Sequence, residues 1–276
     1  MTNIKYIRPL AIAIAAETKR GKSTIGAMIC KKYGGVLCDF SRINQGGGMD
    51  GTPVTYQNIL ANNAITTEAD GTIVKKVGEA FTACNKQGLD IEKHYRLILK
   101  WKDFEDAIQY AQMLSTIQKK KMWLVLDDMT AVRWHKTLDV SERLGHKSNT
   151  QKDWIIAAGE LKLMISALSD KFNLLLINQM IDEYAQTIDE SEAGKKTKNK
   201  EKSGVRVPDW IPRGADYLVD GMLRIEIDKS SFPYKQYLVI EGGREVWICA
   251  DDFVPRVDRV TPDDIFKALG ITEDRL

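Results

Sequence analysis

A glycine-lysine-serine triplet follows a short apolar run near the start of the chain. Residues 16–23 read AETKRGKS, close to the phosphate-binding pattern G-x-x-x-x-G-K-[ST]. In such a loop, backbone N–H groups bind phosphates, the lysine reaches the β- and γ-phosphates, and the hydroxyl binds Mg²⁺. The pattern predicts a nucleotide site, with a chance match in a strand–helix turn as the alternative. The predicted nucleotide-binding residues are Glu17, Thr18, Lys19, Arg20, Gly21, Lys22, Ser23 and Thr24, and Ser23 is also a predicted metal ligand.

The pattern departs from the consensus at its first glycine, which is replaced by Ala16. A methyl group is tolerated at this position if the backbone φ is negative. The departure therefore leaves the prediction of phosphate binding in place.

A carboxylate follows a second apolar run. Asp127 comes directly after WLVL at 123–126, and ligands of parallel sheets bind at the carboxyl ends of the strands. Such a carboxylate can orient Mg²⁺-bound water, so Asp127 is a predicted metal and catalytic residue. The alternative is a strand-end aspartate that caps the next turn, and Asp128 is either an assistant or a solvated side chain.

The segment Asp182–Asp209 has few large apolar residues. It contains a basic run with Lys195, Lys196, Lys198, Lys200 and Lys202. A segment that cannot bury itself is expected to be a flexible loop. Its lysines could contact the phosphates of single-stranded DNA, or they could simply be solvated.

Short apolar strands alternate with amphipathic helices along the chain. Strands are predicted at 10–16, 36–38, 95–99, 122–126 and 174–177, and helices at 25–33, 73–84, 104–118, 150–172 and 262–270. A hairpin is predicted around the glycines at 242–243. This order predicts an α/β fold with a mostly parallel sheet, helices on both faces and a C-terminal β-hairpin. We expect one domain over residues 1–276, with its core at about 8–250.

The composition is that of an ordinary globular protein. The chain has 276 residues, a net charge of +2 and 43% hydrophobic residues, which excludes a disordered chain and a fibrous repeat. The longest apolar run is too short to span a bilayer, and no signal-peptide pattern is visible, so a cytoplasmic protein without membrane contact is expected. The four cysteines lack the spacing of a zinc site or a disulfide framework.

These stretches together resemble the RecA-like branch of P-loop ATPases. The resemblance rests on the loop at 16–23, the run from residue 97 to Asp128, the strand ending in Asn178-Gln179, and the closing strands after residue 215. It covers about residues 8–250 and implies Mg²⁺-dependent ATP binding and slow hydrolysis. In that family the glutamine, here Gln179, lies near the γ-phosphate, and a mobile DNA-binding loop follows it.

The compact size is similar to that of the short RecA-like ATPases of phages and other mobile elements. These proteins act in recombination and single-strand annealing, which implies single-stranded DNA as a partner. The chain starts almost at its first strand, without the arm that RecA recombinases use to polymerise. A ring or a short array of copies is therefore expected rather than a filament.

The catalytic base is left open. The family has a glutamate just after its second strand, whereas this chain has Ser41 near that position. Asp39, Glu17 or Asp128 could replace the glutamate, and Asp39 joins Lys22, Asp127 and Gln179 as a predicted catalytic residue. The candidates for reaching the γ-phosphate of a neighbouring subunit are Arg206, Arg213, Arg224 and Lys229.

Two other functions compete with a DNA-coupled ATPase. The replacements at Ala16 and Ser41 would suit a nucleotide-binding regulatory or scaffolding module with little or no turnover. A phosphotransferase acting on a small acceptor is the third reading, and the lack of an evident arginine-rich lid speaks against it.

Overall fold

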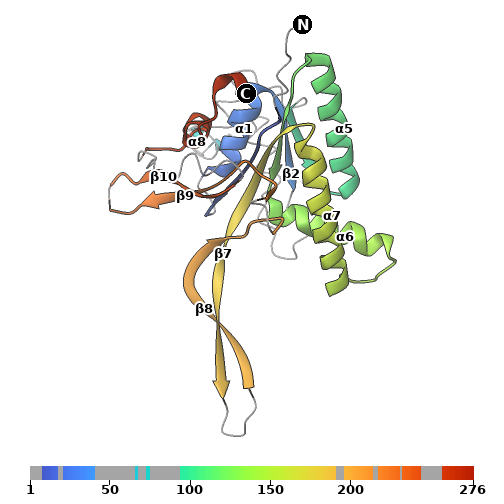
Figure 1. Cartoon of the computed structure of the whole chain (residues 1–276), viewed down its shortest axis with the longest axis vertical. Helices are drawn as coiled ribbons and strands as arrows, with labels where there is room; N and C mark the ends of the chain where they lie inside the picture. The colour runs from blue at the N-terminus through green and yellow to red at the C-terminus, as the bar shows by residue number, and fades with distance from the viewer. Residues whose placement is uncertain are drawn as a thin grey trace.

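A mixed β-sheet organises the protein (Figure 1). The computed structural model describes residues 8–17, 21–40, 66–67, 73–74, 94–190, 196–213, 217–230, 232–243 and 257–276. The strands of the main sheet are β1 (Ala11–Ala16), β2 (Gly35–Phe40), β5 (Tyr95–Ile98), β6 (Trp123–Asp127), β7 (Asn173–Glu190), β8 (Lys196–Pro208), β9 (Gly221–Asp228) and β10 (Lys235–Gly242).

The strand order is β10-β9-β1-β7-β6-β2-β5, and β8 pairs with β7 outside this row. Neighbouring strands are parallel except for the β9–β10 and β7–β8 pairs. This confirms the predicted α/β fold with a mostly parallel sheet. The phosphate-loop strand β1 and the aspartate-bearing strand β6 are separated by β7, so these three strands lie side by side.

Helices cover both faces of the sheet (Figure 1). The helices α1 (Lys22–Tyr33) and α8 (Pro262–Ala268) pack on one face. The helices α5 (Trp101–Gln118), α6 (Met129–Arg143) and α7 (Gln151–Ser169) pack on the other, and a 3₁₀ turn at Glu273–Arg275 follows α8. In the described part of the chain, no helix combines the length and the apolar character needed to span a membrane.

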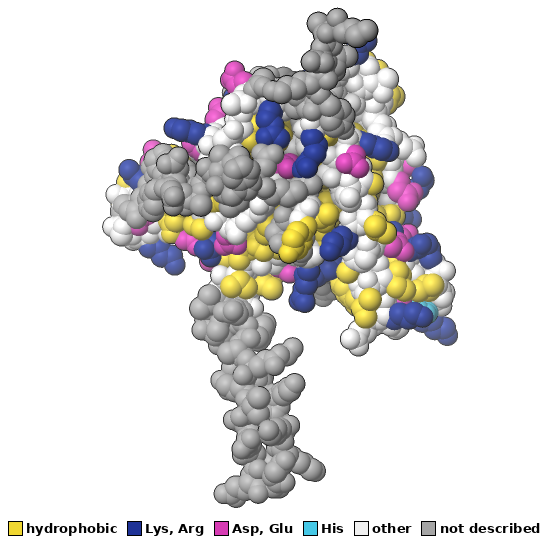
Figure 2. All heavy atoms as spheres, in the orientation of Figure 1, with side chains coloured by type: hydrophobic (Ala, Val, Ile, Leu, Met, Phe, Trp, Pro, Cys, Tyr) yellow, Lys and Arg dark blue, Asp and Glu magenta, His cyan; other side chains and the backbone are white. Residues whose placement is uncertain are grey.

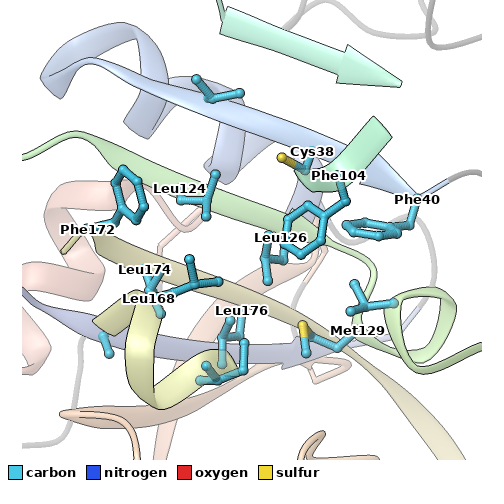
Figure 3. Packing of buried hydrophobic residues seen from close by; sticks show 14 of the residues in the cluster. Cys38, Phe40, Phe104, Leu124, Leu126, Met129, Leu168, Phe172, Leu174 and Leu176 are labelled. Atoms are coloured by element: carbon cyan, nitrogen blue, oxygen red, sulfur yellow. The ribbon is translucent and has the colours of Figure 1, made fainter. Parts of the chain in front are cut away.

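The alternation of β1 divides its side chains between two cores. Ile12 and Ile14 join the cluster under α1 and α8, whereas Ala11 and Ala13 join the cluster under α5, α6 and α7. Figure 3 shows part of this second cluster, in which the rings of Phe40 and Phe104 meet edge to face at 5.0 Å. Because both faces of the strand are buried, its end is held firmly where the phosphate loop begins.

Several predicted helices are confirmed, with small changes at their ends. Thr150 caps α7, and the carboxylate of Asp153 accepts from the Thr150 N–H at 2.7 Å. Helix α5 begins at Trp101, earlier than predicted, and the Asp103 carboxylate accepts from the N–H groups of Leu99 and Lys100. Helix α6 is absent from the predicted elements.

The segment Asp182–Asp209, predicted to be a flexible loop, contains two strands that the sequence did not indicate. Strand β7 continues to Glu190 and pairs with β8, forming a two-stranded ribbon that projects from the body (Figure 1). The physical reason is that two antiparallel strands satisfy each other's backbone hydrogen bonds without a core. Side chains of opposite charge also meet at the base of this ribbon, where Asp182 pairs in register with Arg206.

The start of one predicted helix also needs correction. Ile73–Val74, the start of a predicted helix, forms the short strand β4 with β3 (Thr66–Thr67), and residues 75–84 lie outside the described residues. The structure describes a C-terminal hairpin of β9 and β10. The hairpin predicted around residues 242–243 needs a second strand at 244–249, which lies outside the described residues, so it stays a prediction.

Candidate nucleotide site at the ends of the central strands

The phosphate loop leaves the sheet at the end of β1. Ala16 is the last residue of this strand and is fully buried between its register partners Gln179 and Ile225. Lys119 is the one non-glycine residue with a positive φ in the part of the chain that the structure describes, so φ of Ala16 is negative. The alanine at the first glycine position is therefore accommodated as an ordinary strand residue.

Gly21 and Lys22 form the other end of the loop. Gly21 has φ +84° and is the N-cap of α1, a conformation that favours glycine. The Nζ of Lys22 donates to the backbone oxygens of Ala16 at 2.6 Å and Glu17 at 2.9 Å. The lysine ammonium therefore lies beside the end of β1.

A glycine inside α1 sets how closely this helix approaches the sheet. A Cβ on Gly26 would lie 2.8 Å from Cγ1 of Val125 in β6, which is shorter than van der Waals contact allows. Thr24, one of the predicted nucleotide-binding residues, is buried in the same first part of the helix. This close packing fixes the N-terminus of α1 beside the strand that carries Asp127.

Two buried carboxylates lie on neighbouring strands at the same edge of the sheet. Asp39 of β2 and Asp127 of β6 are register partners, and both are buried. Burial, followed by the charge of Asp127, raises the pKa of Asp39 to about 7, although the Tyr95 hydroxyl donates to Asp39 at 2.7 Å and opposes the shift. Asp39 can therefore exchange a proton near neutral pH.

The carboxylate of Asp128 accepts hydrogen bonds from two elements, α6 and β7. Its Oδ1 accepts from the backbone N–H groups of Thr130 at 2.7 Å and Ala131 at 3.3 Å, which caps α6. Its Oδ2 accepts from Nε2 of Gln179. The aspartate thus joins the start of α6 to the glutamine at the end of the sheet portion of β7.

Gln179 lies between the phosphate loop and the carboxylates. It pairs in register with Ala16 of β1, and two residues earlier Ile177 pairs with Asp127 of β6. The strand then continues directly into the ribbon. Strand β7 therefore runs from the neighbours of Ala16 and Asp127 directly into the ribbon.

Arg206 of β8 forms a second link between ribbon and loop. Its guanidinium donates to the backbone oxygen of Met180 at 2.8 Å and lies 3.6 Å from Asp182 and 3.8 Å from the Glu17 carboxylate. Because Glu17 is also held through its backbone oxygen by Lys22, the lysine, the glutamate and the ribbon form one chain of contacts.

A cleft of about 220 Å³ lies above the end of β1, where β7 and β9 extend beyond it. Its charged lining includes Glu17 and Arg206 on the β7 side and Arg224, Glu226 and Lys229 on the β9 side. Arg224 lies 3.0 Å from Glu226 and 2.8 Å from Glu241. Among the cationic residues proposed to reach a neighbouring subunit, Arg206 and Arg224 thus have acidic neighbours within their own chain.

The structure brings eight of the sixteen predicted site residues to one edge of the sheet. Glu17, Gly21, Lys22, Ser23, Thr24, Asp39, Asp127 and Gln179 all lie at the ends of β1, β2, β6 and the sheet portion of β7 or in the first turn of α1. Lys196, Lys198, Lys200 and Lys202 lie away from this edge, in β8. Thr18, Lys19, Arg20, Ser41 and Lys195 lie outside the described residues.

Two residues near the site could not be identified as site residues from the sequence. Tyr95 contacts Asp39, but it is one of several aromatic residues in apolar strands. Arg259 lies beside Gly21 although it is far away in the chain. Neither residue belongs to a local motif, so only the folded arrangement could identify them.

Comparison with known proteins gives distant structural likenesses. The sequence matches no protein-family model and no curated protein. The KaiC-like protein PH0186 from Pyrococcus horikoshii OT3 is 12% identical, with a TM-score of 0.42 over 86% of this chain and 81% of that one. A solved structure of an ATPase domain is also 12% identical, with a TM-score of 0.41 over 91% of this chain and 80% of that one.

The flagellar accessory protein FlaH from Methanocaldococcus jannaschii is 10% identical, with a TM-score of 0.35 over 92% of this chain and 89% of that one. Likenesses at this distance do not assign the chain to a family. The residues of the site therefore carry the functional proposal.

Proposed function

We propose that this protein is a RecA-like ATPase that binds ATP with Mg²⁺ at its phosphate loop and acts on single-stranded DNA through the β7–β8 ribbon. The observation that carries the proposal is the position of Gln179. This side chain lies between the phosphate-loop strand and the carboxylates, on the strand that becomes the ribbon. The proposed setting is DNA recombination, annealing or replication.

The residues present fit a nucleotide with Mg²⁺. Gly21 at the N-cap of α1 has no side chain to keep a phosphate away, and the Lys22 ammonium lies beside the end of β1. The Ser23 hydroxyl would ligate Mg²⁺, and Asp127 would hold a water of its coordination shell. When bound, the ion would neutralise charge on the phosphates.

Asp39 is the proposed general base. Of the three carboxylates considered, Asp128 is occupied by its helix cap and Gln179, and Glu17 lies beside Arg206. Asp39 has a pKa of about 7, which suits a group that accepts a proton from water near neutral pH. Tyr95 orients the carboxylate through its hydroxyl.

The ribbon is the proposed DNA-contacting element. Lys196, Lys198, Lys200 and Lys202 occupy alternate positions of β8, and alternate residues of a strand share one face. A row of cationic residues along one face suits the evenly spaced phosphates of a single strand. The visible face of the body instead mixes acidic and basic side chains (Figure 2), without one continuous basic surface among its described residues.

Coupling between the two parts is proposed to run through β7. A γ-phosphate would attract the Gln179 amide, which also donates to Asp128. The competition between these two partners would shift the strand that leads into the ribbon. We further propose that copies of the chain assemble into a ring or short array, which size-exclusion chromatography with light scattering can test.

The first test is nucleotide binding by Lys22→Ala. The unaltered protein should bind ATP with Mg²⁺, and the variant should bind it at least about tenfold more weakly because it lacks the phosphate-contacting ammonium. Lys267→Ala is the control, since Lys267 is an exposed residue of α8. Equal ATP affinity of Lys22→Ala and the unaltered protein would contradict the proposed site.

A second candidate is a nucleotide-binding module without useful turnover. The observation favouring it is that the proposed base is a buried aspartate beside another carboxylate rather than a glutamate near solvent. ATP binding without phosphate release, both with and without single-stranded DNA, would support this function over the first.

A further inference from the structure

We infer that Arg259 supplies a second cation to the phosphate chain of the bound nucleotide, from within the same subunit. This inference rests on the proposed nucleotide site and adds a residue to it. A Cβ built on Gly21 would lie 3.4 Å from Nη2 and 3.6 Å from Nε of Arg259. The guanidinium therefore lies directly against the glycine that precedes Lys22.

The position of Arg259 is fixed on its N-terminal side by β10. Gln236 forms an isolated antiparallel bridge with Val257, with N···O distances of 2.6 and 2.8 Å. The side chain of the same glutamine accepts from the backbone N–H of Val260 at 2.9 Å. Val260 is itself buried in the core under α1. The backbone is thus held on both sides of Arg259.

On its C-terminal side the segment is anchored to α1 itself. Helix α8 begins with Thr261 as its cap. Asp263 then pairs with Lys32 at 2.7 Å, and the Phe266 ring meets Tyr33 edge to face at 5.4 Å. Helix α1, which begins at the proposed phosphate site, therefore also anchors α8. Because α8 follows Arg259 closely in the chain, this contact helps to hold Arg259 beside the start of α1.

The electrostatics of this position favour an anionic ligand. The N-terminus of a helix carries partial positive charge, the first turn of α1 contains no acidic residue, and Lys22 lies in the same turn. Arg259 is exposed and has neither a hydrogen bond nor an ion pair with any other described residue. A guanidinium at such a place is repelled unless an anion lies between the charges, and the phosphate chain of a nucleotide provides that anion.

The test measures the affinity of the full-length protein for MgATP and for inorganic tripolyphosphate by calorimetric titration. Arg259→Gln should bind both about tenfold more weakly, as expected when one charge-assisted hydrogen bond to phosphate is lost. Arg259→Lys should recover part of the loss because a point charge remains. Lys267→Gln removes the same charge from an exposed position of α8 and should bind both ligands normally.

Thermal unfolding without nucleotide separates this role from a structural one. Arg259→Gln should unfold at the same temperature as the unaltered protein or slightly higher, because a repelled cation has been removed. Unchanged affinity for both ligands would overturn the inference, and so would a lower unfolding temperature that accounts for the lost affinity. If the unaltered protein itself bound neither ligand, the proposed nucleotide site would fail, whereas normal binding by Arg259→Gln alongside weak binding by Lys22→Ala would refute only the role of Arg259.

Discussion

Strand β7 passes through two very different environments. From Leu174 to Ile177 every residue is fully buried, with β1 and β6 paired on either side. Beyond Ile181 the strand has only β8 as a described partner, and the register shifts between Asp182 and Tyr184. One continuous strand is thus part of the core at one end and of a projecting ribbon at the other.

The part of β7 in the sheet contributes to stability, whereas the part in the ribbon can respond to a ligand. Inside the sheet, apolar side chains are packed by helices on both faces, so that a displacement there disturbs both cores. The ribbon adds backbone hydrogen bonds but projects away from these cores (Figure 1), and such regions open at low cost. A ligand could therefore reorganise the ribbon without unfolding the proposed nucleotide site.

The largest predicted effect compares two apolar residues of this strand. Leu176 is fully buried between both neighbouring strands, whereas Ile181 is 42% exposed. Leu176→Ala should lower the free energy of unfolding by about 3 kcal/mol because it leaves a cavity in the core. Ile181→Ala should lower it by less than about 1 kcal/mol. Denaturant unfolding checks both, and equal losses would show that the strand is not divided as described.

The second prediction concerns how the titration of Asp39 makes the free energy of unfolding depend on pH. The pKa of Asp39 rises from 3.8 to about 7 on folding, so between these values the folded protein holds a proton that the unfolded chain has released. The contribution of Asp39 to the free energy of unfolding therefore falls as the pH rises through this range. Asp39→Asn should remove that decline and raise the free energy of unfolding at pH 8 by about 2 kcal/mol.

Denaturant unfolding at several pH values measures this effect, with Asp170→Asn, an exposed change at the end of α7, as the control. An Asp39→Asn variant whose stability still declined between about pH 4 and about pH 7 like that of the unaltered protein would show that another group titrates there.

The third prediction addresses the ribbon lysines. Replacing Lys196, Lys198, Lys200 and Lys202 by Gln should weaken single-stranded DNA binding by roughly tenfold and lower the slope of log affinity against log salt by about 3. Fluorescence anisotropy at several salt concentrations measures both. The matched control replaces four exposed lysines of the body, Lys152, Lys162, Lys171 and Lys267. A similar loss in the control would indicate a general charge effect instead of a ribbon contact.

The smallest predicted effect tests the link between the two regions. Arg206→Gln removes the guanidinium that lies near Glu17 and Asp182. Because this ion pair is partly exposed, the ratio of DNA-stimulated to basal phosphate release should fall only about two- to threefold. Arg143→Gln, which removes an exposed guanidinium paired with Glu160 at the end of α6, should leave the ratio unchanged. If Arg206→Gln kept the same ratio of DNA-stimulated to basal phosphate release as the unaltered protein, the coupling would not run through this ion pair.

The buried part of the molecule could be predicted well from the sequence. The short apolar run that ends at Ala16 predicts a strand covered on both faces, and the structure has this strand as β1. The capping residues of α7 and α8 likewise marked where these helices begin. These signals are local, so they can be read from the chain alone.

The rest depended on contacts between distant residues or on weak local signals. The ribbon has the composition of a loop, and its strands become visible only when paired with each other. Arg259 reaches Gly21 only after β10 and α8 have docked. The environment of Asp39 likewise needs β5 and β6 beside β2. The chemistry of the candidate site could therefore be proposed from motifs, but its proton exchange and its additional cation could not.

The central claim is that one strand couples nucleotide turnover to a DNA-contacting ribbon. The most direct measurement is phosphate release from MgATP with and without single-stranded DNA, for the unaltered protein, Lys22→Ala and the variant with four ribbon lysines replaced. We predict stimulation by DNA in the unaltered protein, no release by Lys22→Ala, and basal release without stimulation in the ribbon variant. Phosphate release that is indifferent to DNA in the unaltered protein, or equal stimulation in the ribbon variant, would contradict the claim.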